Sequence, residues 1–514
     1  MPPRPIRLGG PLSIEHVSLV ARADARVSLT PAATRRITDS RAVVEAATRD
    51  GQAHYGINTG FGSLSQTRVP ADQLRDLQRN LVRSHAAGVG PPLPAEVVRA
   101  TMLLLAASLA RGNSGVRPVV VRALCDLLNA GITPVVPEVG SVGASGDLAP
   151  LAHIALVLIG EGHATTRAGR TVSGARALAD ARLDALTLEA KEGLALINGT
   201  HLMAARAALL CRDASILFES ALSAAAMCID ACKATDAFLD PRVYDARNQP
   251  GPAYVASRLR QLLRGSRIVA SHRRGDPRVQ DPYSLRCAPA VLGAAWDTLR
   301  YVESAVIHEL GAVTDNPLVF AATSHVRGNR AASGVVSAGN FHGMPLAIPL
   351  DTLAIALSHL AGIAERRIYF LLAATDRHNP LPAYLSPKPG LHSGLMIAQY
   401  TAAACCNEIV GLAAPASVAN IPTSAGMEDY NSFGPRAAAK AQRALDLARR
   451  VVAVEFLCAA QAIDHHRPLR SGTLVERAHA VVRRLVPTLT VDRPLTPDIE
   501  RLAHAVADAQ FISL

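Results

Sequence analysis

The chain has 514 residues, of which 49% are hydrophobic and 4% aromatic, and its formal net charge is +11. The arginines that carry this charge are spread along the sequence, and no basic run is interleaved with aromatic residues, which argues against a nucleic-acid-binding protein. The apolar stretch 101–110 is too short to span a membrane, and the first ten residues lack the apolar core of a secretory signal. Because the eight cysteines show no metal-binding spacing, we expect reduced thiols in a cytoplasmic protein and no metal site.

The first fifty residues predict a small mixed structure. Two short strands are expected at 17–21 and 26–30, followed by a helix that begins near Pro31. The glycine-rich segment HYGINTGFGS (54–63) after that helix predicts a loop.

Long apolar stretches at helical spacing dominate the rest of the sequence. They predict helices at about 73–87, 95–111, 116–130, 148–160, 202–235, 253–264, 289–314, 345–373, 393–414 and 435–463. Several exceed twenty residues and no linker interrupts them, so we expect a mainly α protein, a bundle of long helices with pockets where the loops converge. The expected domains are an N-terminal domain at 1–196 and a helical bundle with C-terminal helices at 197–514.

The segment GSVGASGDLAP (140–150) joins a glycine-rich loop to a helix. Gly143 and Gly146 give the backbone unusual freedom around Ser145, and Asp147 is expected to cap the following helix. The segment lacks the lysine of a phosphate-binding loop and the G-x-S-x-G order of a hydrolase nucleophile. On its own, a capped structural loop is the simpler interpretation.

Six further segments change this interpretation, because all seven occur together in one order. In chain order, the seven segments are YGINTGFG (55–62), RSHAAGVG (83–90), GSVGASGDLAPLAH (140–153), INGTH (197–201), QDPYSLRC (280–287), GNFHG (339–343) and SAGMEDYNSFG (424–434). The ordered set resembles the aromatic amino acid ammonia-lyase and aminomutase family, and within it most closely the histidine ammonia-lyases, from about residue 10 to beyond residue 460. The resemblance implies a fumarase/aspartase-like fold of long helices, with a smaller mixed N-terminal part that carries the catalytic loops.

The resemblance also implies a prosthetic group made from the chain itself. In that family the tripeptide that matches Ala144, Ser145 and Gly146 cyclises without another enzyme into 4-methylideneimidazol-5-one, an electrophile. The residues suit this reaction, because Gly146 lets its amide nitrogen approach the Ala144 carbonyl and Ser145 can lose its hydroxyl as water.

Two catalytic side chains are implied by the resemblance. Tyr55 is the expected base for the β-proton, which requires its phenol, with a usual pKa of about 10, to be partly ionised by a lowered pKa. Helix N-termini aimed at the pocket are the expected cause. Asn198 is expected to hydrogen-bond the carbonyl of the ring and stabilise developing negative charge.

The segment QDPYSLR predicts a short helix with two functional side chains on one face. Asp281 is expected to cap it and Pro282 to begin it, so that Tyr283 and Arg286 lie three residues apart. By resemblance, Arg286 binds the substrate carboxylate through a bidentate contact, and Tyr283 and Gln280 lie near the prosthetic group.

The resemblance implies a homotetramer whose subunits share their active sites. Tyr55, the prosthetic group and Arg286 are expected to come from different chains. Phe341 is expected to flank the prosthetic group, and Asn340 to contact the substrate. An amino acid substrate is expected, with no metal, nucleic acid or membrane partner.

Three residues point to the substrate. Ser84 and His85 stand where family members select their side chain, and a Ser-His pair is typical of histidine lyases. Glu428 matches the carboxylate that those enzymes place near the imidazole, where it would be unfavourable beside a plain phenyl ring. These residues favour elimination of ammonia from L-histidine to give trans-urocanate.

Several residues depart from the histidine-lyase pattern and leave alternatives open. Met427 and Tyr430 flank Glu428 in place of a glutamine and a histidine, and His201 replaces a glutamine. A tyrosine or phenylalanine ammonia-lyase, or a 2,3-aminomutase, therefore remains an alternative. A non-catalytic oligomeric helical protein whose Ser145 never cyclises is a further one.

Overall fold

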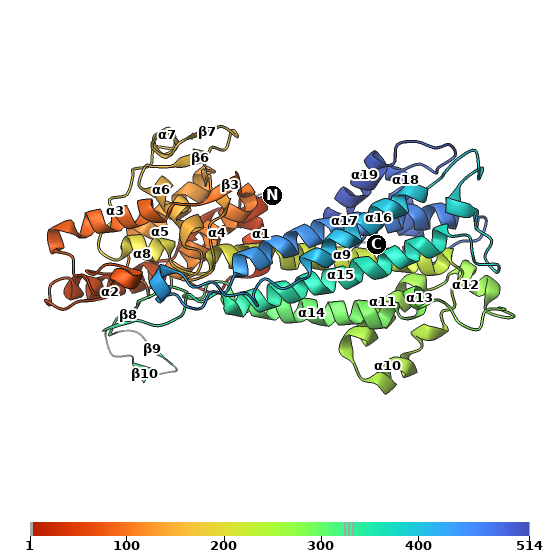
Figure 1. Cartoon of the computed structure of the whole chain (residues 1–514), viewed down its shortest axis with the longest axis horizontal. Coiled ribbons are helices and arrows are strands. Elements are labelled where there is room, and N and C mark those ends of the chain that lie inside the picture. The colour runs from red at the N-terminus through yellow and green to blue at the C-terminus, as the bar shows by residue number, and fades with distance from the viewer. Residues whose placement is uncertain (1–3, 323–324, 327–328, 331–333, 513–514) are drawn as a thin grey trace. The chain divides into compact units, whose positions relative to one another are not determined.

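The structure is a computed structural model that describes residues 4–322, 325–326, 329–330 and 334–512, and it is mainly α-helical, as predicted (Figure 1). The chain divides into two compact units, each assembled from three segments. The first unit contains Met1–Leu209, Glu303–Leu350 and Ala416–Ala439, and the second contains Leu210–Val302, Asp351–Pro415 and Lys440–Leu514. The boundary expected between residues 196 and 197 lies near the end of the first segment, whereas the two later segments of the first unit come from the stretch expected as helical bundle.

The first fifty residues form a two-stranded parallel sheet and two helices. The elements are β1 (Ile6–Leu8), α1 (Ile14–Arg22), β2 (Val27–Leu29) and α2 (Pro31–Ala47). Helix α2 starts at the predicted proline, with the Thr30 side chain as its cap. The strand predicted at 17–21 is wrong, because a capping box between Ser13 and His16 begins a helix there.

In the first unit, α1 packs against the apolar helix α4 (Ala95–Leu109), whose residues from Val97 to Leu109 are all buried. The further helices of this part of the chain are η1 (Gly62–Leu64), η2 (Ala71–Gln73), α3 (Leu74–His85), α4 (Ala95–Leu109), α5 (Pro118–Ala130), α6 (Leu148–Leu158), α7 (Gly174–Asp180), α8 (Glu192–Ile197) and η5 (Ser424–Gly426). The loops between them, rather than the helices alone, supply the residues of the site described below.

Only short strands accompany these helices in the described part of the chain. They are β3 (Val89–Pro92), β4 (Thr133–Pro134), β5 (Pro137–Val139), β6 (His163–Thr165), β7 (Thr171–Ser173), β8 (Leu318–Phe320), β9 (His325–Val326), β10 (Asn329–Arg330) and β11 (Gly334–Val336). Strands β4, β6 and β7 form an antiparallel sheet, and β3 with β5, β8 with β11 and β9 with β10 form antiparallel pairs.

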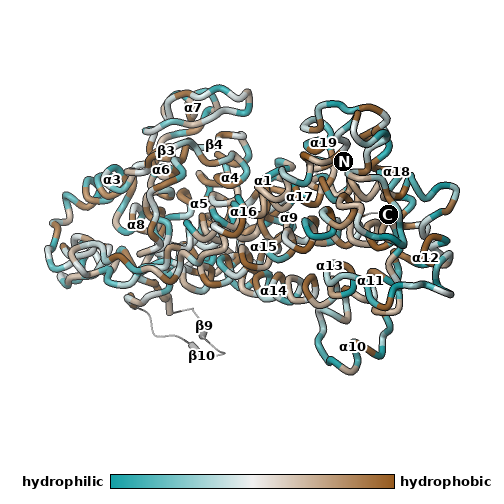
Figure 2. Tube along the Cα trace, turned by 45° about the vertical axis from the view of Figure 1, so that its right-hand side comes forward, coloured by the Kyte–Doolittle hydropathy of each residue, from teal (hydrophilic) through white to brown (hydrophobic). Residues whose placement is uncertain are grey.

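Four of the five unit boundaries fall within long helices, so each unit contains part of each of these helices. These are α9 (His201–Ala231), α14 (Ala288–Glu309), α15 (Met344–Leu372) and α17 (Gly434–Asp464). The second unit adds η3 (Ala237–Leu239), α10 (Pro241–Arg247), α11 (Pro250–Leu263), α12 (Arg267–His272), α13 (Tyr283–Arg286), η4 (Ala383–Leu385), α16 (Met396–Leu412), α18 (Thr473–Leu485) and α19 (Thr496–Ala507). Hydrophobic and hydrophilic positions interleave along the helices of both units (Figure 2), as amphipathic packing requires.

All ten helices predicted from periodicity are present, with ends displaced by a few residues. Helices α7, α8, α10 and α12 were not predicted, because each is too short to show a helical repeat. Helices α9 and α15 are long and apolar enough to cross a membrane by length and composition, but 83% and 61% of their most apolar windows are buried. Such burial is what core helices show.

Candidate active site

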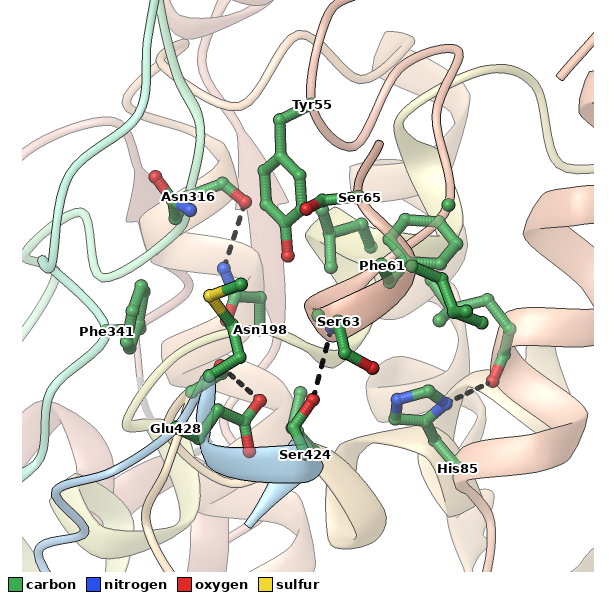
Figure 3. A pocket seen from close by; sticks show the side chains of 18 of the residues that line it. Tyr55, Phe61, Ser63, Ser65, His85, Asn198, Asn316, Phe341, Ser424 and Glu428 are labelled. Carbon is green, nitrogen blue, oxygen red and sulfur yellow. Dashed lines mark hydrogen bonds between the residues drawn. The ribbon is translucent and has the colours of Figure 1, made fainter. Parts of the chain in front are cut away.

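A cavity of about 760 Å³ in the first unit collects many of the predicted site residues (Figure 3). Its volume is typical of pockets that bind small molecules. The predicted residues that line it are Tyr55, Ser84, His85, Ser145, Asn198, Phe341 and Glu428. They come from six separate segments of the chain, so the fold brings together residues that are distant in the sequence.

One face of α3 forms a wall of the cavity. Leu77, Asn80, Leu81, Ser84 and His85 all line it. Their spacing of three and four residues places them on one side of the helix. This wall is thus mixed, with Leu77 and Leu81 apolar and Asn80 polar, and its last two residues, Ser84 and His85, are polar.

The loop Ala144-Ser145-Gly146 presents its serine to the cavity and buries its two neighbours. The Ser145 hydroxyl donates to Glu428 Oε1 over 3.4 Å. Gly146 has a φ of +76°, and a Cβ there would lie 2.1 Å from the carbonyl oxygen of Gly199, so only glycine fits. The residues present therefore fit a group formed by backbone cyclisation at this tripeptide.

Asp147 anchors this loop to another helix. It stands at the N-cap position of α6 but makes no side-chain cap bond there, which corrects the predicted capping role. Its carboxylate instead accepts the backbone N–H groups of Leu202 and Met203, at 2.9 and 3.0 Å, in the first turn of α9. Burial raises the pKa of Asp147 to about 7, although these two N–H groups act in the opposite direction.

Tyr55 points its hydroxyl into the cavity (Figure 3). Burial raises its pKa above 10, the charges of Glu428 and Asp315 raise it further, and the backbone N–H of Gly62 lowers it. The predicted lowering of the pKa is therefore wrong for this chain, because burial of the phenol outweighs the Gly62 N–H, and the depth of that burial is not evident from the sequence. Tyr55 and Ser145 line the same cavity of one chain, so a second subunit is not needed to bring these two together.

The imidazole of His85 is oriented by its own helix. Its Nδ1 lies 2.9 Å from the carbonyl oxygen of Leu81 and 3.1 Å from the Ser84 hydroxyl. Because a carbonyl oxygen only accepts, Nδ1 carries a hydrogen, and Nε2 of the neutral ring is an acceptor. That second nitrogen faces the cavity (Figure 3).

Glu428 lies on the opposite side of the cavity from His85 and is held by its own loop. The Thr423 hydroxyl donates to Oε2 over 2.8 Å, and the backbone N–H of Thr423 donates to the carbonyl of Glu428. The Oε1 atom is thus available to a ligand when Ser145 no longer has its hydroxyl. The cavity therefore presents two acceptors, an imidazole nitrogen and a carboxylate oxygen.

Asn198 belongs to a buried charged network. Lys191 Nζ contacts Asp315 Oδ2 over 2.7 Å, and the Asn198 amide donates to Asp315 Oδ1 and to the Asn316 carbonyl, each over 3.1 Å. Burial lowers the pKa of Lys191, which Asp315 opposes. Both amide hydrogens of Asn198 are thus donated away from Ser145, while its Oδ1 is buried without a partner.

Phe341 lines the cavity, as expected of a residue that flanks the reactive loop. Its neighbour Asn340 does not line it, and the Asn340 amide donates to the Val313 carbonyl over 3.2 Å. The expected contact of Asn340 with the substrate stays a prediction.

The segment QDPYSLR lies in the second unit and forms a compact cluster of its own. Arg286 donates to Gln280 Oε1 over 2.7 Å and to the Asp281 carbonyl over 2.9 Å, and its guanidinium lies 4.6 Å from the centre of the Tyr283 ring. The four-residue helix begins at Tyr283, and the Asp281 carboxylate accepts the N–H of Thr235 rather than capping it. Gln280, Tyr283 and Arg286 thus act as one group, and their role towards a substrate stays a prediction.

A comparison with known proteins identifies the family. The family model for aromatic amino acid lyases matches residues 12–484. The chain belongs to the aromatic amino acid lyase family. This lyase is 48% identical over 505 residues to the histidine ammonia-lyase of Anaeromyxobacter sp. (strain K), with 97% of each chain covered.

Solved structures give the same result. The crystal structure of histidine ammonia-lyase from Trypanosoma cruzi matches this lyase with a TM-score of 0.90 and 38% identity, covering 99% of this chain and 94% of the other. Tyrosine aminomutase from Streptomyces globisporus matches with a TM-score of 0.92 and 36% identity, covering 99% and 98%. The resemblance inferred from the seven segments is therefore confirmed.

Sequence reasoning missed several residues of this lyase's cavity region. Lys191 and Asp315 are buried beneath Asn198, and Ser63 and Ser424 line the cavity. Lys191 could have been found, because it is a rare lysine immediately before the apolar run of α8. Among the described residues, no three His, Cys, Asp or Glu side chains are placed to hold a metal ion.

Proposed function

We propose that this lyase eliminates ammonia from L-histidine to form trans-urocanate, using 4-methylideneimidazol-5-one formed from Ala144, Ser145 and Gly146. The observation that carries the proposal is that one cavity is lined by Ser145, by the candidate base Tyr55, and by two hydrogen-bond acceptors suited to an imidazole, which are His85 and Glu428. The similarity to histidine ammonia-lyases over nearly the whole chain supports it.

The prosthetic group would supply an electrophilic carbon that turns the substrate amine into a better leaving group. The residues of the chain bind the substrate and move its proton. Tyr55 directs its hydroxyl into the cavity and, once ionised, accepts the β-proton. His85 Nε2 and Glu428 Oε1 each accept a hydrogen bond, so a neutral imidazole can donate its one N–H to either of them, and an imidazolium can donate to both. Arg286, oriented by Gln280 and stacked on Tyr283, is suited to a carboxylate.

A second candidate function rests on Met427. This side chain lines the cavity beside Glu428, and it adds apolar surface where histidine lyases carry a glutamine. An apolar wall favours a phenol or phenyl ring. A tyrosine or phenylalanine lyase, or a 2,3-aminomutase acting on the same substrates, is therefore the alternative.

One assay separates these functions. Purified protein is incubated separately with L-histidine, L-tyrosine and L-phenylalanine, and the ultraviolet absorbance of each conjugated acid is followed over time. Urocanate from histidine alone is the expected result. Coumarate or cinnamate would establish the alternative lyase, and a β-amino acid would establish an aminomutase. Turnover of none of the three, together with an unmodified intact mass, would favour a non-catalytic helical protein.

We expect Glu428→Gln to weaken the use of histidine selectively. Glutamine keeps an acceptor for Thr423 but turns a neutral N–H₂ towards the cavity, so the charge-assisted bond to the imidazole is lost. The kcat/KM for histidine should fall by about 10- to 100-fold, the usual effect of removing a hydrogen bond to a charged group. The inhibition constants of tyrosine and phenylalanine should change little.

The control for this variant is Glu96→Gln, which removes a surface carboxylate paired with Arg22. Since Glu428 also contacts the Ser145 hydroxyl, the intact mass of the variant shows whether its tripeptide has cyclised. In a cyclised variant, inhibition by tyrosine and phenylalanine that weakens by the same factor as kcat/KM for histidine would contradict imidazole recognition by Glu428.

The family resemblance supports a homotetramer in the cytoplasm, with active sites shared between subunits. Tyr283 is 71% exposed in the single chain, although it belongs to the predicted carboxylate-binding cluster. A partner subunit that covers this ring would account for its exposure.

A further inference from the structure

The carbonyl groups of the loop at 143–146 are held by three residues from outside the tripeptide. The Ser432 hydroxyl donates to the Gly143 carbonyl over 3.1 Å, and the Gly199 N–H donates to the Ser145 carbonyl over 3.1 Å. The Ser141 hydroxyl lies 3.3 Å from the Gly146 carbonyl. Three of the four successive carbonyls therefore have fixed directions.

The two groups that ring closure would join are left free. The Ala144 carbonyl and the Gly146 N–H make no hydrogen bond with any of the described residues, although Ala144 is only 5% exposed and Gly146 is buried. Buried backbone groups are nearly always paired. An unpaired donor and an unpaired carbonyl two residues apart, between fixed neighbours, are free to react with each other.

Ser432 holds the carbonyl that immediately precedes this pair. It is fully buried, and a Cβ on Gly143 would lie 2.1 Å from its hydroxyl oxygen. The next residue, Phe433, donates its N–H to the Val142 carbonyl over 2.9 Å and has a φ of +50°, a conformation that residues other than glycine rarely adopt. The adjacent residues Ser432 and Phe433 thus donate hydrogen bonds to the adjacent carbonyls of Gly143 and Val142.

We infer that Ser432 is a positioning residue for the self-cyclisation of Ala144, Ser145 and Gly146, an inference that rests on the proposed function. Its hydroxyl fixes the peptide plane between Gly143 and Ala144. Because the Ser145 carbonyl is also fixed, by Gly199, the Ala144 carbonyl between these two bonds has less freedom to rotate. Such restriction of rotation accelerates an intramolecular reaction.

The reaction needs no oxidant or other reactant. The Gly146 nitrogen forms a bond to the Ala144 carbonyl carbon, and its proton moves to the carbonyl oxygen. That oxygen leaves as water with the proton of the Ser145 nitrogen, which becomes doubly bonded to the same carbon. The Ser145 hydroxyl then leaves as a second water with the Cα proton, and a double bond forms between Cα and Cβ.

The test follows cyclisation directly rather than activity. The full chain is made by cell-free synthesis, and intact-mass spectra taken at intervals separate protein that has lost no, one or two water molecules. Ser432→Ala should cyclise roughly fivefold more slowly than the wild type, as expected from one lost hydrogen bond. Ser432→Thr, which keeps the hydroxyl, should restore the rate. Ser40→Ala is the matched control, because Ser40 is also fully buried and donates to a carbonyl, that of Ile37, outside the loop.

The outcomes separate the inference from the function on which it rests. A wild-type chain that never loses two waters would refute the prosthetic group itself. Thermal unfolding shows whether Ser432→Ala is folded. If the folded variant cyclises at the same rate as the wild type, the role of Ser432 is overturned. Should Ser432→Ala fail to fold, Ser432→Cys replaces it, since a thiol is only a weak donor and should also slow cyclisation; an unchanged rate in that variant would overturn the role equally.

Discussion

Ser145→Ala is expected to abolish turnover while leaving the fold intact. Alanine has no hydroxyl to lose as the second water, so no methylidene carbon forms at this position. In the described structure the Ser145 side chain makes one hydrogen bond, to Glu428 over 3.4 Å, and its loss should change the free energy of unfolding by only about 1 kcal/mol. The measurements are turnover of histidine, intact mass and thermal unfolding.

Ser40→Ala again provides the control, because it removes a buried hydroxyl from the same unit without touching the cavity. It should retain the activity and the mass of the wild type. Measurable turnover by a Ser145→Ala protein free of wild-type contamination would show that the reaction does not depend on this serine.

Tyr55→Phe is expected to lower kcat/KM by about 10²- to 10⁴-fold, the usual contribution of a general base. It should also change the dependence on pH. Burial holds the pKa of Tyr55 above 10, so the reactive phenolate is a minor species at neutral pH and increases about tenfold for each pH unit up to that pKa. The activity of the wild type should therefore rise towards alkaline pH.

The comparison between the two proteins isolates the tyrosine. The substrate amine also loses its proton as the pH rises, but this contribution is the same in the wild type and in Tyr55→Phe. The ratio of their kcat/KM values should thus increase with pH. Tyr244→Phe is the matched control, since it removes a phenol with a pKa raised to about 12 that donates to the Phe238 carbonyl in the second unit. A ratio that does not vary with pH would exclude Tyr55 as the base.

Long helices and the order of the loop segments could be predicted from the sequence, because both depend on local pattern. Helical periodicity is a property of neighbouring residues, and α17 begins within one residue of its predicted start. The strand predicted at 17–21 is wrong because the structure of this segment depends on a residue outside it. Its β-branched residues indicate a strand, but the cap at Ser13, outside that window, makes it a helix.

The site was predictable as a set of residues but not as an arrangement. Sequence order could identify Tyr55 and Ser145, yet the direction of the Tyr55 pKa depends first on how deeply the fold buries the phenol, and then on the charges of Glu428 and Asp315, which lie far away in the chain. Asp147 illustrates the same limit. Its position before α6 predicts a local cap, whereas the fold offers it the N-terminus of α9, whose unpaired N–H groups bind it instead.

The contact between Ser432 and Gly143 joins residues 289 positions apart, and this separation has a consequence for biosynthesis. A ribosome completes the loop long before it has made Ser432 and Phe433, which hydrogen-bond to its carbonyls. The growing polypeptide should therefore cyclise more slowly until more than four fifths of its translation is finished. A truncated product that ends before Ser432 would carry the tripeptide but should form the electrophile more slowly than the full chain.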